Sequence, residues 1–154
     1  MLAAAGVLAL AGCGGSSGRS SVPGGADPDA VKVIKGWVDA LRAGHVDDAT
    51  DFFSVPTVVQ NGTPPLELTS RQQVVQFNES LPCGAKLTRA EPHGRFVVAT
   101  FVLTDRPGPG SGQCGAGVGE TAQTAFAIHD GHITEWRRVA TAPPSQQTGT
   151  APVI

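Results

Sequence analysis

AFAIHDGHITEWRRV, the stretch from Ala125 to Val139, decides how the second half of this chain of 154 residues folds. At its centre, Asp130-Gly131 is a two-residue pair that favours the tight turn of a β-hairpin. Apolar residues recur on both sides of the turn, as they do in half-buried strands. We therefore predict one strand from about Val118 to His129 and a second strand from His132 to Val139.

A regular register outward from this turn places six side chains on one face of the sheet, as three cross-strand pairs. The pairs are Ile128 with Ile133, Phe126 with Glu135, and Thr124 with Arg137. The opposite face then carries Gln123, Ala125, Ala127, Thr134, Trp136 and Arg138. The face that is buried decides whether Glu135 and Arg137 are surface charges or pocket residues.

Upstream of this hairpin, period-two alternation continues between turn residues. Strands are predicted from Ala85 to Glu91 and from Arg95 to Asp105, joined by Pro92-His93-Gly94. A short hairpin is predicted still earlier, between Thr57–Gln60 and Leu66–Leu68. The four long strands are expected to run up and down in one antiparallel sheet.

The first half of the chain shows helical periodicity instead. Asp27 and Pro28 fit an N-cap and a first-turn proline, and Gly44 fits the C-terminal end of the same helix. The apolar residues between these ends recur on one helix face: Ala30, Ile34, Trp37, Val38 and Leu41.

Two shorter helices are expected after the first one. One begins at Asp47 or Asp48 and continues to Phe53, because Pro56 then forces extended backbone. The other begins with a capping box formed by Ser70 and Gln73, and Pro82 ends it.

Composition limits the size of the domain and the kinds of partner. The chain is long enough for one domain, residues 27–141, followed by a disordered Pro-, Gln- and Thr-rich tail over residues 142–154. The formal net charge is −2, so we predict no nucleic-acid partner. His129 and His132 are predicted cross-strand neighbours, but a catalytic zinc takes three protein ligands, so we predict neither a metal site nor a cofactor.

Three stretches carry a resemblance to a known fold. They are WVDALRAGHVDDATDFF (Trp37 to Phe53), VVQNGTPPLELTSRQQVVQF (Val58 to Phe77) and the hairpin from Ala125 to Val139. Their order resembles the nuclear transport factor 2-like (NTF2-like) superfamily, especially its polyketide-cyclase-like (SnoaL-like) branch. The resemblance implies an α+β fold in which three N-terminal helices pack on a curved antiparallel sheet, a cystatin-like cone whose mouth often holds an apolar pocket.

The resemblance also suggests where to look for chemistry. Enzymes of this superfamily place an Asp on the cone wall as a general acid or base, often with a His or Arg partner. If the face of Thr124, Glu135 and Arg137 lines the cone, these side chains reach a ligand, together with Thr100 from the neighbouring strand. If that face meets solvent, Glu135 and Arg137 form a surface pair worth about 0 to 1 kcal/mol. No catalytic residue is assigned.

Near the N-terminus, Leu10-Ala11-Gly12-Cys13 ends an apolar run and resembles the lipobox of bacterial lipoproteins. The run is too short to span a bilayer. The resemblance implies a signal peptide over residues 1–12, and a diacylglycerol on Cys13 followed by a flexible tether over residues 13–26. Signal peptides begin with positive charge, yet the first basic residue is Arg19. Either the basic start lies upstream or the resemblance misleads.

A lipid at Cys13 would tether the domain to the extracytoplasmic face of the bacterial cell membrane, where disulfides persist. Cys83 and Cys114 then remain as an even pair, and we expect them to be bonded. The predicted strands support this pairing, because the two cysteines lie at strand starts at the same end of the sheet.

Three functions remain open from the sequence. The first is an envelope lipoprotein whose domain is not catalytic and binds an apolar small molecule or an envelope protein. The second is an isomerase or cyclase that uses Glu135 or Glu120 with Arg137. The third is an accessory domain that docks on a larger cell-wall enzyme. A solidly packed cone would exclude a small-molecule ligand, whereas a carboxylate deep in an open pocket would favour the enzyme.

Overall fold

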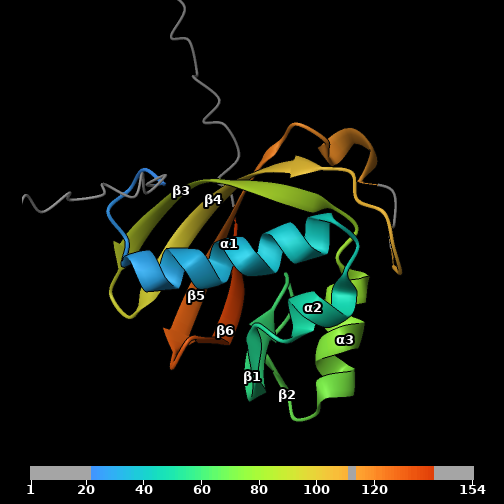
Figure 1. Ribbon diagram of the computed structural model, residues 1–154, viewed down its shortest axis with the longest axis horizontal. Helices are drawn as coiled ribbons and strands as arrows, with labels where there is room; N and C mark the ends of the chain where they lie inside the picture. Colours follow the sequence, from blue (N-terminus) through green and yellow to red (C-terminus); the bar gives the residue numbers. More distant parts are fainter. Residues whose placement is uncertain (1–21, 111–113, 141–154) are drawn as a thin grey trace, which may run out of the picture.

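The computed structural model describes residues 22–110 and 114–140. Three helices pack on a curved sheet of six strands, which confirms the expected α+β class (Figure 1). The helices are α1 (Pro28–Arg42), α2 (Val46–Thr50) and α3 (Arg71–Ser80), and a single 3-10 turn, η1, spans Gly115–Gly117. The strands are β1 (Phe53–Gln60), β2 (Leu66–Leu68), β3 (Gly84–His93), β4 (Phe96–Thr104), β5 (Thr121–His129) and β6 (His132–Val139).

The strand order is β2-β1-β6-β5-β4-β3, and the sheet is open rather than closed into a barrel. The sheet is also mixed, because β1 runs parallel to β6 while every other neighbouring pair is antiparallel. The expectation of a wholly antiparallel sheet is therefore corrected at this one junction. Turn residues reveal which consecutive strands pair, but β1 and β6 are distant in the chain and no turn signal joins them.

Helix α1 lies along the concave face of the sheet, and α2 and α3 pack beside it near β1 (Figure 1). The side chain of Asp27 accepts hydrogen bonds from the backbone N–H groups of Asp29 and Ala30, so the predicted N-cap is present. The capping box of Ser70 and Gln73 at the start of α3 is also present. The five apolar residues predicted for the buried face of α1 are all buried.

Helix α2 is shorter than the sequence indicates. It ends at Thr50, and Phe53 begins β1 instead of closing the helix. The backbone N–H of Ile133 donates to the carbonyl of Phe52 at 2.8 Å, so the chain here already pairs with β6. Phe53 is buried against Trp37, which means that tertiary packing overrides the local helical signal.

Trp37 lies at the centre of the core. Its ring meets Phe53, Phe101, Phe126 and Trp136 edge-on, with centroid separations from 5.5 to 6.4 Å. Its indole N–H donates to the side-chain oxygen of Asn78 at 2.9 Å. Helix α1, helix α3 and the sheet are thus joined through one residue.

Asn78 is fully buried, and its polar atoms are all engaged. The side-chain nitrogen donates to the carbonyl of Val74 at 3.0 Å and to the hydroxyl of Thr50 at 3.3 Å. The hydroxyl of Thr50 in turn donates to the carbonyl of Val46. A buried amide is tolerated here because its hydrogen bonds are made within the protein.

The segment after β4 folds back against the end of α3. The guanidinium of Arg106, which is only 6% exposed, donates to the carbonyl of Leu81 from two nitrogens, at 2.8 and 2.9 Å. Further bonds reach the carbonyls of Glu79 and Pro109. Burial lowers the pKa of Arg106, but an arginine stays protonated at any ordinary pH. Its charge therefore caps the carbonyl end of the helix.

The expected disulfide between Cys83 and Cys114 is present. It joins the start of β3 to the segment that precedes η1, over a separation of 31 residues. The predicted signal peptide, Cys13 and the tail over residues 142–154 lie outside the described residues. The last part of the predicted tether is bound to the domain, because Pro23 and Ala26 form backbone hydrogen bonds with Ala90 of β3.

Candidate functional site

A β-bulge in the last hairpin changes which residues share a face of the sheet. Ile128 pairs with Ile133 as expected, but the next pair is Ala127 with Glu135, so Thr134 is an extra residue on β6. The hydroxyl of Thr134 donates to the carbonyl of Ala127 at 3.1 Å. A bulge inserts one unpaired residue and shifts every later pair by one.

Beyond the bulge, the predicted register is wrong. Phe126 pairs with Trp136 and not with Glu135, and Thr124 pairs with Arg138 and not with Arg137. Phe126, Trp136 and Thr124 are buried on the concave face, toward α1. Glu135 and Arg137 consequently lie on the outer face of the sheet.

The four predicted pocket residues are divided between the two faces. Thr124 is on the concave face, whereas Thr100 pairs with Gln123 on the outer face and accepts a hydrogen bond from its side chain at 3.2 Å. Glu135 and Arg137 do lie together, because a guanidinium nitrogen of Arg137 is 2.7 Å from a carboxylate oxygen of Glu135. Both side chains point to the face of the sheet opposite Thr124. The structure therefore does not bring these four side chains together on one face of the sheet.

Glu135 is part of an ionic cluster on the outer face. Its carboxylate binds Arg95 at 2.5 Å and Arg137 at 2.7 Å, and the Arg95 guanidinium lies over the ring of Phe96. Hydrogen bonds from Arg95 and then Arg137 hold the pKa of Glu135 below its usual value, although partial burial acts in the opposite direction. Glu135 is therefore ionised at neutral pH and suited to holding the two arginines.

The other predicted carboxylate, Glu120, is exposed in the turn that precedes β5. The backbone carbonyl of Glu120 accepts a hydrogen bond from the N–H of Leu103. Neither Glu120 nor Glu135 lies in a cavity between the helices and the sheet.

Such a cavity of about 300 Å³ lies on the concave face; we call it the cone cavity. Its volume is at the lower end of the range for small-molecule sites. Residues from α1, from the segment after α3, from four strands and from the loops between them line it, and no Asp, Glu or His is among them. The lining residues are Trp37, Val38, Leu41, Asn61, Leu81, Pro82, Cys83, Ala85, Phe101, Leu103, Gly117, Ala122, Gln123, Thr124, Trp136 and Arg138.

Apolar and polar groups are separated around the cone cavity. The aromatic rings of Trp37, Phe101 and Trp136 belong to the core cluster of the protein. Three polar residues also line the cavity. Thr124 comes from β5, Arg138 comes from the adjacent β6, and Asn61 directly follows β1, the other neighbour of β6. The disulfide borders this cavity through Cys83, and Gly117 lies against both sulfur atoms.

Trp136 adds an unusual feature to the cavity wall. Its indole N–H is buried and has no hydrogen-bond partner among the described residues. A buried donor without a partner costs about 1 to 3 kcal/mol, so most folded proteins avoid one.

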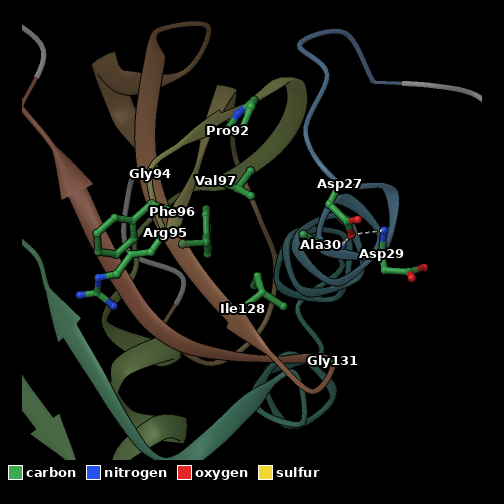
Figure 2. Close-up of a pocket in the computed structure, with 11 residues that line it drawn as sticks. Asp27, Asp29, Ala30, Pro92, Gly94, Arg95, Phe96, Val97, Ile128 and Gly131 are labelled. Atoms are coloured by element: carbon green, nitrogen blue, oxygen red, sulfur yellow. Dashed lines mark hydrogen bonds between the residues drawn. The ribbon is translucent and has the colours of Figure 1, made fainter.

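A second hollow, the hairpin hollow, lies between the N-terminus of α1 and the tips of two hairpins and has a volume of about 410 Å³ (Figure 2). Val97 and Ile128 line it from the sheet, whereas the guanidinium of Arg95 points away from Asp27 and Asp29. Asp27 is used as the helix cap and Arg95 binds Glu135. The charged groups of this hollow are engaged in structure or separated, so the cone cavity is the better candidate site.

Metal binding has no support among the residues that the structure describes. They contain no group of three His, Cys, Asp or Glu side chains placed to hold an ion. His129 and His132 are cross-strand partners as predicted, but both are exposed beside the turn.

The sequence does not lead directly to the residues of the cone cavity. A regular register predicts that Trp136 and Arg138 lie on the face opposite Thr124. Asn61 falls in the loop of the predicted first hairpin, where no particular role is expected. One signal was available, because Ile133 and Trp136 are both bulky and apolar but three positions apart. Residues on one face of a regular strand are an even number apart, so this spacing indicates a bulge between them.

Comparison with known proteins supports the fold. No family model and no curated protein sequence matches the chain. The structure is similar to a provisionally assigned ketosteroid isomerase from Kribbella flavida, with a TM-score of 0.54, 13% identity, and coverage of 82% of this chain and 90% of that one. A provisionally assigned polyketide cyclase from Sinorhizobium meliloti gives a TM-score of 0.51, 16% identity, and coverage of 70% and 94%.

A third similar structure is an epoxide hydrolase of the LEH-like type from M. tuberculosis, with a TM-score of 0.50, 19% identity, and coverage of 71% and 80%. Other similar structures are described as NTF2-like proteins of unknown function. These likenesses show that the chain has the NTF2-like fold. At such low identity they do not extend to activity, because one fold hosts many unrelated functions.

Proposed function

We propose that this protein is a lipid-anchored binding protein of the bacterial cell envelope, and that its cone cavity holds an apolar small molecule without transforming it. The observation that carries the proposal is the cavity itself, about 300 Å³ in volume and walled by aromatic and aliphatic side chains. Apolar cavities with a few polar groups are the usual form of small-molecule sites.

The residues around the cavity argue against acid–base catalysis. Isomerases and hydrolases need a general acid or base within hydrogen-bond reach of the substrate. The lining residues of the cone cavity include no carboxylate and no histidine. Glu135, the strongest candidate from the sequence, is on the outer face and ion-paired with two arginines. An enzyme that uses Glu135 or Glu120 with Arg137 is therefore not proposed.

Docking on a larger cell-wall enzyme has less support than ligand binding. That function requires a contiguous exposed apolar patch of several hundred Å². Among the described residues, the large exposed apolar side chains are Val55, Leu66 and Val118. Val118 lies in the loop before β5, whereas the other two belong to the hairpin of β1 and β2.

Ligand binding is tested with N-phenyl-1-naphthylamine, an uncharged apolar probe. The chain has two tryptophans and no tyrosine, and both tryptophans line the cavity. Probe bound in the cavity is therefore expected to quench tryptophan emission by energy transfer. The full-length Cys13→Ser chain is used, so that no covalent acyl chain competes for the cavity.

Two substitutions on β5 provide the control. Ala122 lines the cavity, whereas Ala125 lies on the outer face of the same strand. Ala122→Phe is expected to fill the cavity and abolish quenching, while Ala125→Phe keeps it; circular dichroism checks that both variants fold. Equal quenching in the two variants would refute binding in the cone cavity.

Membrane attachment rests on Leu10-Ala11-Gly12-Cys13 and on the Gly- and Ser-rich residues after it. Two acyl chains give durable anchoring, which a single chain does not. Among the described residues, no helix is both long and apolar enough to cross a bilayer.

The Cys13→Ser variant is expected to move from the detergent phase to the aqueous phase when bacterial membranes are extracted with a detergent that separates on warming. Immunoblotting of the two phases measures the change. The Cys83→Ser/Cys114→Ser variant, which keeps Cys13, is expected to remain in the detergent phase. A wild-type protein whose mature form carries an unmodified Cys13 by mass spectrometry would contradict the anchor.

A further inference from the structure

We propose that the ligand of the cone cavity is an amphipathic anion, whose apolar body lies among the aromatic side chains and whose charged head binds Arg138. This inference rests on the proposed ligand-binding function and specifies the chemical class of the ligand. Four observations support it: the direction of Arg138, its lack of a protein partner, the polar groups beside it, and the absence of negative charge in the cavity lining.

Arg138 belongs to the concave face because of the bulge at Thr134. It lies two positions after Trp136, which is buried on that face, and alternate residues of a strand share a face. Its cross-strand partner is Thr124, and both residues line the cone cavity. Arg137, which precedes Arg138 in the chain, points to the outer face and binds Glu135.

Arg138 also differs from the other arginines that the structure describes, because its side chain has no partner among the described residues. Arg42, Arg71, Arg89, Arg95 and Arg137 each bind a carboxylate, and Arg106 binds backbone carbonyls. The side chain of Arg138 is exposed and makes no hydrogen bond or ion pair with a described residue. An arginine that lines a cavity and has all of its donors free is suited to bind a carboxylate or a phosphate.

The polar groups around the cavity gather near this arginine. Thr124 is adjacent to it across β5 and β6, and is 5% exposed. Asn61 directly follows Gln60, the residue of β1 that pairs with Arg137 on β6. Thr124 and Arg138 thus lie opposite each other on β5 and β6, and Asn61 lies just beyond the end of the neighbouring β1, so the three side chains can supply hydrogen bonds to one charged group.

The remaining walls are suited to an apolar chain or ring. Trp37, Phe101 and Trp136 form one side, with leucines from α1, from the segment after α3 and from β4. Arg138 is the only charged residue among those that line the cavity. Glu120 is exposed in the turn before β5 and is not one of them. The electrostatic preference of the site is thus for a negative head group.

The test compares three ligands that have the same apolar chain: decanoate, decan-1-ol and decylammonium. Each one displaces N-phenyl-1-naphthylamine from the full-length Cys13→Ser chain, at concentrations below those at which it forms micelles. Decanoate is expected to bind about tenfold more tightly than decan-1-ol, since one charge-assisted contact commonly changes affinity by this factor. Decylammonium is expected to bind most weakly.

Two neighbouring residues serve as a matched pair of variants. Arg138→Gln is expected to remove the preference for decanoate, by lowering its affinity about tenfold to that of decan-1-ol. Arg137→Gln, on the other face of the same strand, should change neither value. Arg138→Lys keeps the charge and should retain part of the preference. Monodecyl phosphate, measured in parallel, distinguishes a phosphate head group from a carboxylate.

The outcomes separate this inference from the function on which it rests. If the naphthylamine probe does not bind at all, the proposed ligand-binding function fails. If the probe binds but decanoate and decan-1-ol displace it equally, or if Arg138→Gln and Arg137→Gln behave alike, ligand binding stands and the anionic head group is wrong. A preference for decylammonium would also overturn the inference.

Discussion

Replacing both Cys83 and Cys114 by serine is expected to lower the free energy of unfolding by about 3 to 4 kcal/mol, because the unfolded chain then loses a crosslink that closes a long loop. The two cysteines are 31 residues apart in the sequence, and the loop between them contains β3, β4 and the segment that leads to η1. Small domains have a free energy of unfolding of about 5 to 15 kcal/mol, so this loss is a large fraction of the total.

Urea denaturation followed by circular dichroism measures this change. The oxidised wild-type protein and the double variant are compared first. Wild-type protein treated with a reducing agent should then unfold at the midpoint of the double variant, which should not respond to the reducing agent. A midpoint that reduction leaves unchanged would show that the crosslink contributes nothing to stability.

The disulfide also illustrates what the sequence can predict here. Two signals in the sequence predict the pairing: only two cysteines remain if Cys13 carries a lipid, and both lie at predicted strand starts at the same end of the sheet. The helix caps at Asp27 and Ser70 and the hairpin at Asp130-Gly131 were equally predictable, because each one depends on residues a few positions apart. Local chemistry determines these features.

The candidate site depends on features that are not local. The cone cavity combines residues from α1, from the chain after α3 and from β3, β4, β5 and β6, and a single bulge decides which residues of β6 face it. A regular register without the bulge predicts Glu135 and Arg137 as pocket residues, because it places them on the same face as Thr124. One inserted residue moves that pair to the outer face and brings Arg138 to the cavity.

The parallel pairing of β1 with β6 is non-local in the same way. Phe53 pairs with Ile133, so this contact joins two residues that are far apart in the sequence. The sequence around Phe53 favours helix, and the strand forms because Phe53 is buried against Trp37 and Phe77. Core packing around Trp37 therefore accounts for the early end of α2 and for the start of β1 at Phe53.

Trp37→Ala is accordingly expected to have one of the largest effects of any single substitution, lowering the free energy of unfolding by about 3 to 5 kcal/mol, the usual range when a buried aromatic side chain is removed. The side chain is 4% exposed, and it contacts four aromatic rings from β1, β4, β5 and β6. Urea denaturation followed by circular dichroism measures the loss, because tryptophan fluorescence itself changes in the variant.

Phenylalanine substitutions at the two tryptophans separate the packing contribution from that of the hydrogen bond. Trp37→Phe removes an indole N–H that binds the buried oxygen of Asn78, so we expect a loss of about 1 to 3 kcal/mol beyond the change in volume. Trp136→Phe removes an indole N–H that has no partner among the described residues, so no hydrogen bond is lost and the cost should not exceed that of the change in volume. The first variant should therefore unfold at a clearly lower urea concentration than the second. Equal midpoints would mean that the bond between Trp37 and Asn78 does not stabilise the core, and that the packing of the rings alone holds α1 against the sheet.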